Sequence, residues 1–405
     1  MQPTTTIKVR QKDLSNALQA ASRVTLSPYK CENKCLKHIY SCIVFRVGDC
    51  PSVEVMGSDW MKVIATTVAL TGREGDARSF AIMKEDITPI IRRLDDQELV
   101  IELYEYQATF RHSCGSFKVP LVKEDLDEVF SRQKEMASRH TTQTLELEAP
   151  FFRSMLDRLC KYAAQDQWRP AMAGICIKRK GGKVEYTASD GHRLIRITKA
   201  DTECTLESSL LIPIETLSIL RWITPRTGFV TIDYSEWNNN SDKKPVCHIG
   251  IDTVTELWFT PTEGKYPNYN AAIPIPNKYD WKFKVQRMML SKSLDRMDLF
   301  CPTTNTISLQ SYKDKVIMSA EDKDFGLQAS ETLPVEHETP TFHTSFGIRI
   351  RNMQNILSTI KDKEIYIQGI SKVGTPKTIT SVSPTEGEEV TIIFMPCVKN
   401  SDMEE

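Results

Sequence analysis

The chain has 405 residues, of which 40% are hydrophobic and 26% are charged, and its formal net charge is −1. Because single hydrophobic cores stop growing at roughly 250 to 300 residues, this length predicts two or three domains. The composition excludes disordered and fibrous proteins, and the charge excludes a protein coated in positive charge. The apolar runs are much shorter than the roughly 20 residues of a membrane span, and residues 1–6 lack a secretory signal. We therefore expect a cytoplasmic protein without membrane contact.

The predicted elements follow the same order three times along the chain. Each copy has a strand, an amphipathic helix, a strand that ends at an aspartate, a second helix and an alternating strand. The first helices are expected around Ala17–Ala21 and over Phe151–Ala164 and Met288–Phe300, and the second helices over Lys84–Leu94, Ile214–Ile223 and Arg349–Ile360. The alternating strands are Leu99–Leu103, Phe229–Asp233 and Glu364–Gln368. The pattern predicts an α+β fold in which two helices per copy pack against antiparallel sheet.

One motif shows the repeat most clearly. Val53-Glu-Val-Met-Gly-Ser-Asp59 recurs as Val184-Glu-Tyr-Thr-Ala-Ser-Asp190 and, more weakly, before Asp322, so the spacing of the aspartates is 131 and then 132 residues. Equal spacing predicts three equivalent domains, residues 1–135, 143–275 and 280–400, followed by an acidic tail, 401–405. The boundaries are placed in a polar stretch, 132–143, and a proline-rich stretch, 273–281, because such compositions are typical of linkers.

The eleven cysteines lie scattered in apolar contexts, which favours reduced thiols over a disulfide framework. One group, Cys31, Cys35, His38 and Cys42, offers thiolates and an imidazole that would suit zinc. Paired Cys-x2-Cys spacing is missing and Cys42 lies in a predicted strand. We therefore expect neither a metal nor another cofactor.

Basic residues recur on and beside the predicted helices. Singly, each is typical of a solvated helix face, but their recurrence in three copies favours a shared surface that contacts phosphates without reading base sequence. The candidates are Arg10, Lys12, Arg153, Arg158, Lys161, Arg221, Arg226, Arg287, Lys292, Arg296, Arg349 and Arg351.

Three segments resemble one known family, the bacterial-type DNA sliding clamp, which is the beta subunit of the replicative DNA polymerase III holoenzyme. They are Ala188-Ser-Asp-Gly-His-Arg-Leu194, Gly264-Lys-Tyr-Pro-Asn-Tyr269 and Ile392-Ile-Phe-Met-Pro396, and the resemblance covers residues 5–399. It implies a ring-shaped homodimer of three-domain subunits joined head to tail, which encircles double-stranded DNA. It also implies a processivity role without catalysis, in which the ring tethers the replicative polymerase, the clamp loader and other clamp-motif proteins.

The resemblance also implies functional residues. A partner-peptide pocket between the second and third domains would be formed by Met172, Ser189, Gly191, His192, Arg193, Leu194, Pro267, Ile393, Met395, Pro396 and Cys397. The turn with Gln167 and Arg169 would contact DNA, and Phe117, Leu299 and Phe300 would lie at the dimer interface. The local alternatives are a hairpin turn at Asp190-Gly191 and ordinary core packing of the three apolar residues.

Two other functions remain open at this point. One is a ring-shaped scaffold that does not encircle DNA. The other is a hydrolase that uses Asp190 and His192, but the chain has no Gly-x-Ser-x-Gly elbow, no phosphate-binding loop and no His-Glu-x2-His site. A non-catalytic DNA clamp is the favoured hypothesis.

Overall fold

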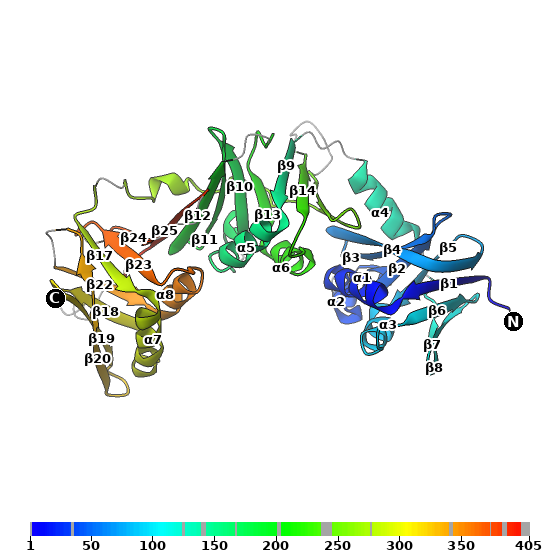
Figure 1. Ribbon diagram of the computed structural model, residues 1–405, viewed down its shortest axis with the longest axis horizontal. Helices are drawn as coiled ribbons and strands as arrows, with labels where there is room; N and C mark the ends of the chain where they lie inside the picture. Colours follow the sequence, from blue (N-terminus) through cyan, green and yellow to red (C-terminus); the bar gives the residue numbers. More distant parts are fainter. Residues whose placement is uncertain are drawn as a thin grey trace. The chain divides into compact units, whose positions relative to one another are not determined.

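The computed structural model describes residues 2–33, 36–123, 126–138, 143–166, 168–200, 204–235, 245–275, 278–339, 343–372, 374–382 and 387–397. The chain forms two compact units, and Figure 1 labels their helices and strands. Unit 1 contains Met1–Arg153, Glu203–Ser208 and Glu215–Pro261, and unit 2 contains Ser154–Thr202, Ser209–Ile214 and Thr262–Glu405. Among the described residues, no helix has both the length and the apolar character needed to cross a membrane.

Unit 1 is built on one antiparallel sheet of twelve strands with the path β8-β7-β6-β1-β4-β16-β15-β14-β9. Strand β3 pairs with β4 and β2, and β2 also pairs with β5. The strands are β1 (Thr5–Arg10), β2 (Cys42–Val47), β3 (Ser52–Ser58), β4 (Lys62–Gly75), β5 (Arg78–Met83), β6 (Glu98–Leu103), β7 (Gln107–His112), β8 (Gly115–Pro120), β9 (Gln143–Glu148), β14 (Phe229–Tyr234), β15 (Cys247–Ile251) and β16 (Thr255–Phe259). Alternating burial along β1 and β6 places one face of these strands in the core.

The helices of unit 1 are α1 (Gln11–Val24), α2 (Pro28–Asn33), α3 (Lys84–Ile91), α4 (Asp127–Ala137) and, apart from its first residue, α6 (Ile214–Ile223). Helix α1 packs on β3 and β4 and beside α3. Its buried Leu14, Ala17, Leu18 and Ala21 recur at steps of three and four residues, which gives the helix one apolar face.

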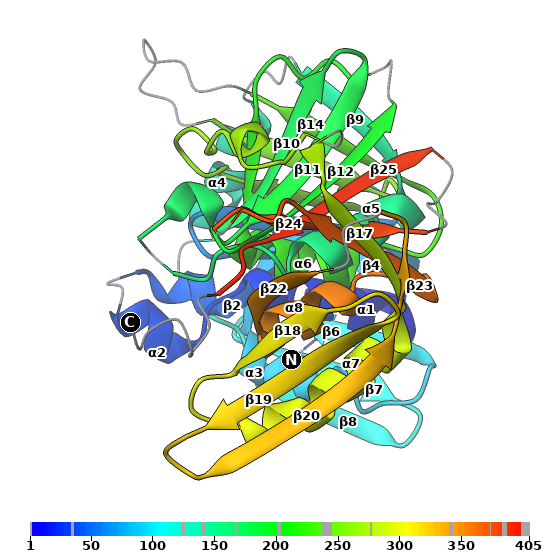
Figure 2. The same cartoon turned by 90° about the vertical axis from the view of Figure 1, so that its left-hand side faces the viewer.

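Unit 2 contains a nine-stranded sheet, β13-β10-β11-β12-β25-β24-β23-β17-β21, and a four-stranded sheet, β20-β19-β18-β22, all antiparallel (Figure 2). The strands are β10 (Gly174–Lys180), β11 (Lys183–Ser189), β12 (Arg193–Ala200), β13 (Leu210–Pro213), β17 (Trp281–Gln286), β18 (Thr306–Ser311), β19 (Lys315–Asp322), β20 (Leu327–Pro334), β21 (Glu336–His337), β22 (Thr344–Arg349), β23 (Glu364–Gly369), β24 (Lys377–Ser381) and β25 (Glu388–Phe394). Helices α7 (Arg287–Met297) and α8 (Ile350–Leu357) pack against each other, and α5 (Ala149–Leu159) begins in unit 1 and ends in unit 2. The predicted α+β fold with antiparallel sheets is confirmed.

Helix α4 occupies part of the stretch that we predicted to be a linker, and that expectation was wrong for residues up to 137. The helix buries Val129, Gln133 and Met136, whose four- and three-residue spacing places them on one face of the helix within a polar segment. Val129 and Met136 belong to a core cluster with Val63 and Trp258, so α4 covers the pair of strands β4 and β16. The predicted tail, 401–405, lies outside the described residues.

Candidate functional site

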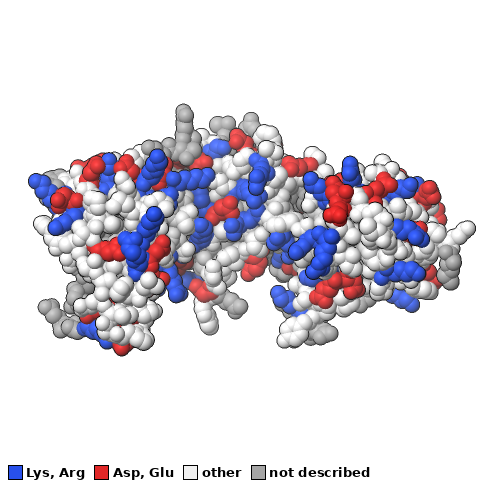
Figure 3. All heavy atoms as spheres, turned by 60° about the horizontal axis from the view of Figure 1, so that its bottom comes forward, with Lys and Arg blue, Asp and Glu red and all other residues white. Residues whose placement is uncertain are grey.

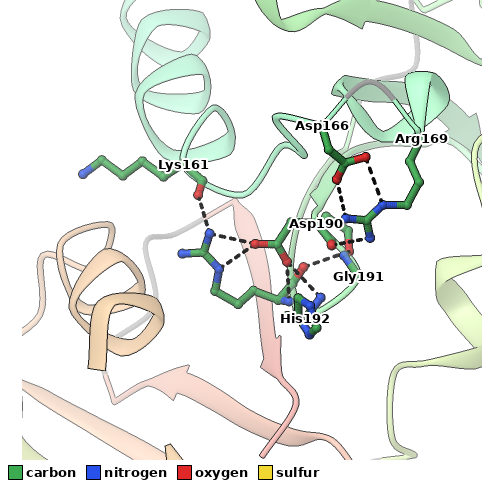
Figure 4. Close-up of polar contacts among 8 residues, drawn as sticks. Lys161, Asp166, Arg169, Asp190, Gly191 and His192 are labelled. Carbon is green, nitrogen blue, oxygen red and sulfur yellow. Dashed lines mark hydrogen bonds and ion pairs between the residues drawn. The ribbon is translucent and has the colours of Figure 1, made fainter. Parts of the chain in front are cut away.

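The predicted site in unit 2 is organised by a tight turn between β11 and β12 (Figure 4). The Asp190 carboxylate accepts the backbone N–H groups of His192 and Arg193 through Oδ1, at 2.9 and 2.7 Å. The Ser189 hydroxyl donates to the Arg193 carbonyl at 2.8 Å and accepts the Gly191 N–H at 3.1 Å. Gly191 has φ of +86°, a conformation that favours glycine. The turn is therefore fixed by its own side chains.

The Arg193 side chain also stabilises this turn. Its side chain is only 8% exposed, and its guanidinium donates to Asp190 Oδ2 at 2.8 and 3.0 Å and to the Lys161 carbonyl at 3.1 Å. It also lies over the Tyr162 ring, 5.5 Å from the centroid. These contacts hold the guanidinium against the turn, while its Nη1 has no hydrogen-bond partner among the described residues. A role of Arg193 in peptide binding stays a prediction.

Arg169 closes the other side of the turn. It donates to the Asp190 carbonyl at 2.6 Å and forms an ion pair with Asp166, as Figure 4 shows. A Cβ at position 191 would lie 2.6 Å from Arg169 Nη1, so the glycine also makes room for this arginine. Gln167, which was predicted beside it, lies outside the described residues.

An apolar cluster lies beside the turn. Its buried members are Cys176, Leu194, Leu211, Tyr266, Tyr269 and Ile393, and Ala171, Met172 and Ile273 pack against them. Leu194 and Ile393 are direct partners in the pairing of β12 with β25. The sheet thus brings together two predicted residues that are 199 positions apart in the sequence.

Exposed residues surround this cluster. The Met395 N–H donates to the His192 carbonyl at 2.8 Å, and its side chain is 39% exposed. His192 and Pro267 are exposed, and Met172 is partly exposed. We call Met172, His192, Pro267 and Met395, with Leu194 and Ile393 behind them, the docking face. The chain continues past it through Pro396 to Cys397, which exchanges backbone hydrogen bonds with Gly347 at 2.9 and 3.2 Å.

Sequence reasoning missed four members of the cluster, namely Cys176, Leu211, Tyr266 and Tyr269. The two tyrosines stand in the Gly264–Tyr269 motif, three residues apart, and pack edge to face with ring centroids 6.1 Å apart. Burial raises the pKa of both hydroxyls, so they stay protonated. Burial also raises the pKa of the Cys176 thiol to about 12.

The predicted basic residues divide into two groups. Several have partners within the chain. Arg158 pairs with Glu388, Arg296 with Glu331 and, at 4.0 Å, Arg10 with Asp96. Arg153, Lys161 and Arg287 donate hydrogen bonds to Thr224, Ser358 and Asp362. Arg221 is exposed and also has an interaction partner. The exposed residues without an ion pair to any described residue are Lys12, Arg226, Lys292, Arg349 and Arg351. We call these five the free cations. Figure 3 shows Lys and Arg interleaved with Asp and Glu on the face in view.

The predicted interface residues differ in exposure. Leu299 is 72% exposed, so it is not a core residue. Phe300 is half-buried, and Phe117 stacks on Phe110 with ring centroids 4.9 Å apart.

The structure gives Asp190 and His192 no arrangement that suits hydrolysis. A catalytic carboxylate would contact the imidazole, whereas Asp190 contacts the His192 backbone and the Arg193 side chain. For the zinc hypothesis, Cys35 lies outside the described residues and Cys31 and Cys42 are buried in an apolar cluster. No group of three or more His, Cys, Asp or Glu suited to a metal occurs among the residues that the structure describes.

Comparisons with known proteins give a consistent result. No family model matches the chain. A beta sliding clamp from Synechococcus elongatus is 21% identical over 316 residues, which cover 76% of this chain and 79% of that protein. The DNA polymerase III beta subunit of Thermotoga maritima has a TM-score of 0.83 at 17% identity, and a DNA polymerase sliding clamp of Pseudomonas aeruginosa has 0.82 at 15%; each alignment covers 98% of this chain and 100% of the other. The chain has the fold of bacterial DNA sliding clamps and is similar in sequence to a curated beta sliding clamp, as its three motifs predicted.

Proposed function

We propose that the chain is a DNA sliding clamp, a non-catalytic processivity factor that encircles duplex DNA and tethers the replicative polymerase, the clamp loader and other partners. The observation that carries this proposal is the agreement of fold over 98% of the chain with solved polymerase clamps. The proposed assembly is a head-to-tail homodimer of three-domain subunits, with Leu299, Phe300 and Phe117 at the junction. The exposed Leu299 supports this assignment, because an isolated leucine in water gains by burial against a partner.

Charge supports topological rather than tight binding. The net charge is −1, and four of the predicted basic residues, Arg10, Arg158, Arg169 and Arg296, are paired with carboxylates of the chain. The free cations supply a small number of phosphate contacts, which hold DNA without base specificity. A closed ring needs no more than this, since tight binding would slow sliding.

The docking face is the proposed site for short peptides of partner proteins. Methionine side chains are flexible and polarizable, so Met172 and Met395 suit a surface that accepts several sequences. The turn beneath is held rigidly by Asp190, Ser189 and Arg193, which limits the entropy lost on binding.

The experiment that tests encirclement is loading onto nicked circular DNA with a clamp loader, followed by linearisation of the circle. Retention on the intact circle and release after cutting is the expected result. Equal retention on cut and uncut DNA, or no retention on either, would contradict it and favour surface binding or a scaffold without DNA.

A further inference from the structure

A small pocket adjoins the docking face in unit 2. It has a volume of about 260 Å³ and is lined by Cys176, Lys178, Ser209 and the segment Lys265–Asn270. Three of these residues, Cys176, Tyr266 and Tyr269, also belong to the apolar cluster behind the docking face. Pro267 belongs to both the pocket and the docking face. The pocket and the docking face therefore share a wall.

The charge of the pocket is one-sided. Its nine lining residues include two lysines, two asparagines, one serine and two tyrosines, but no aspartate or glutamate. Lys178 and Lys265 are exposed, and neither forms an ion pair with any residue that the structure describes. The pocket thus presents positive charge that no lining residue neutralises.

One carboxylate, that of Glu185, lies near Lys178 but contacts other residues. Glu185 lies opposite Lys178 in the pairing of β10 with β11. Its side chain is buried, accepts the Tyr269 hydroxyl at 2.6 Å and lies 3.7 Å from Arg196. Arg196 in turn donates to Asn270 Oδ1 at 3.1 Å, which leaves the amide N–H groups of Asn270 for another acceptor.

We propose that this pocket binds a carboxylate of the peptide that occupies the docking face, either an acidic side chain or the C-terminal carboxylate. This inference rests on the proposed peptide docking. Two ammonium groups and the amide N–H groups of asparagine are suitable donors for a carboxylate. At about 260 Å³ the pocket is smaller than the roughly 300–1,000 Å³ of sites that enclose a whole small-molecule ligand, so a single side chain or chain end fits its size.

The test begins with selection of displayed random dodecapeptides on the intact chain and on the Lys178→Ser, Lys265→Ser variant. We expect both proteins to enrich apolar residues and only the intact chain to enrich aspartate or glutamate at a fixed distance from them. Acidic enrichment that survives the double substitution would overturn the proposal. Failure of both proteins to enrich apolar residues would instead count against the proposed docking face.

Synthetic copies of the selected peptides separate the two carboxylate sources. One copy carries Asn or Gln for the acidic residue, and the other has an amidated C-terminus. The copy that lacks the bound carboxylate is expected to bind the intact chain about tenfold more weakly than the unaltered peptide does. The double variant is expected to bind both peptides with equal affinity. If neither change alters affinity for the intact chain, the pocket has no carboxylate role.

A matched control removes the same charge elsewhere in unit 2. Lys313→Ser with Lys315→Ser changes two exposed lysines at the start of β19, outside the pocket lining. Its peptide affinity should equal that of the unaltered chain, which excludes a general electrostatic effect. Thermal melting checks that both double variants are folded.

Discussion

Asp190 and Arg193 form the same pair that Asp59 and Lys62 form in the first repeat. Oδ1 of each aspartate accepts the backbone N–H of its partner, at 2.7 and 2.8 Å, and Oδ2 meets the partner's cation at 2.8 and 2.7 Å. Trp60, at the position of Gly191, also has a positive φ, +77° against +86°. Two copies of one turn thus share their bracing but differ in the residues at the tip.

The bracing predicts that Asp190→Ala destabilises unit 2, because it leaves the buried Arg193 cation without its carboxylate. The expected loss is about 3 kcal/mol in the free energy of unfolding, measured by denaturant titration. Affinity for partner peptides should fall with it. Asp59→Ala is the matched control: it should destabilise the chain and leave peptide affinity unchanged, and loss of affinity there would contradict the assignment of the site.

Met395→Asp is expected to weaken partner-peptide binding by roughly 30-fold, as for an interface residue worth about 2 kcal/mol. Because the side chain is 39% exposed, the substitution should leave the fold intact. Met61 is 40% exposed at the tip of the equivalent turn, so Met61→Asp is the control. Fluorescence anisotropy of labelled peptide measures both, and equal effects would argue against a unique docking face.

Neutralising the free cations is expected to lower the salt dependence of DNA binding. Removal of one phosphate contact should reduce the slope of log K against log salt by about 0.9. The variant carries alanine at Lys12, Arg226, Lys292, Arg349 and Arg351, and binding to duplex DNA is measured at several salt concentrations. Arg158→Ala with Arg296→Ala removes paired cations instead and should leave the slope nearly unchanged. If this double variant lowered the slope and the free-cation variant did not, the paired cations would be the ones that contact DNA.

Leu299→Glu is expected to convert the proposed dimer to monomer, because a charge would replace an apolar side chain at the junction. Light scattering after size-exclusion chromatography measures the mass. Val254→Glu places the same charge at another apolar position, which is 45% exposed, and should leave the dimer intact. If the Leu299→Glu variant remained a dimer, the interface would not include Leu299.

The stability of unit 1 should depend on the charge of His248. Burial lowers the pKa of this imidazole, but the hydrogen bond to Asp233 at 3.1 Å and the Glu256 carboxylate at 3.7 Å outweigh burial and raise the pKa to about 9. A folded-state pKa above the ordinary 6.5 means that the contribution is full below pH 6.5 and is lost as pH rises through about 9. Its upper limit is about 3 kcal/mol, and partial exposure reduces it.

Thermal melting between pH 6 and 10 tests this dependence against His248→Asn, which lacks a titrating imidazole. The unaltered chain should lose more stability over this range than the variant. The His248 ring stacks on Trp258 with centroids 5.0 Å apart, so tryptophan fluorescence can follow the local change. Identical pH profiles would show that His248 is not the titrating group.

The sequence predicted regular elements well where local pattern and tertiary packing agree. The α6 helix has the predicted bounds, Ile214–Ile223. The α5 helix was expected to reach Ala164 but ends at Leu159, because Tyr162 N–H bonds to Leu159 and Ala164 N–H bonds to the distant Met172 carbonyl. The apolar spacing continues past the helix end, and only the tertiary contact terminates it.

The candidate site was predicted in part. Leu194 and Ile393 could be placed together from the family resemblance, but the buried role of Arg193 depends on the Lys161 carbonyl, which no local pattern reveals. Likewise, the segment around Gln133 is mostly polar, so its sequence did not indicate the buried face by which helix α4 packs against unit 1. Long-range contacts decide both cases.

Helix α4 bears on the number of partners that the proposed clamp could bind. It covers Val63 and Trp258, which are partners in the pairing of β4 with β16. Leu194 and Ile393 are partners in the same way in the pairing of β12 with β25. The pair that corresponds to the inner residues of the proposed docking face is thereby covered by the chain itself. A dimer built from this chain would hold two partners at once, and a third would have to wait for one of them to leave.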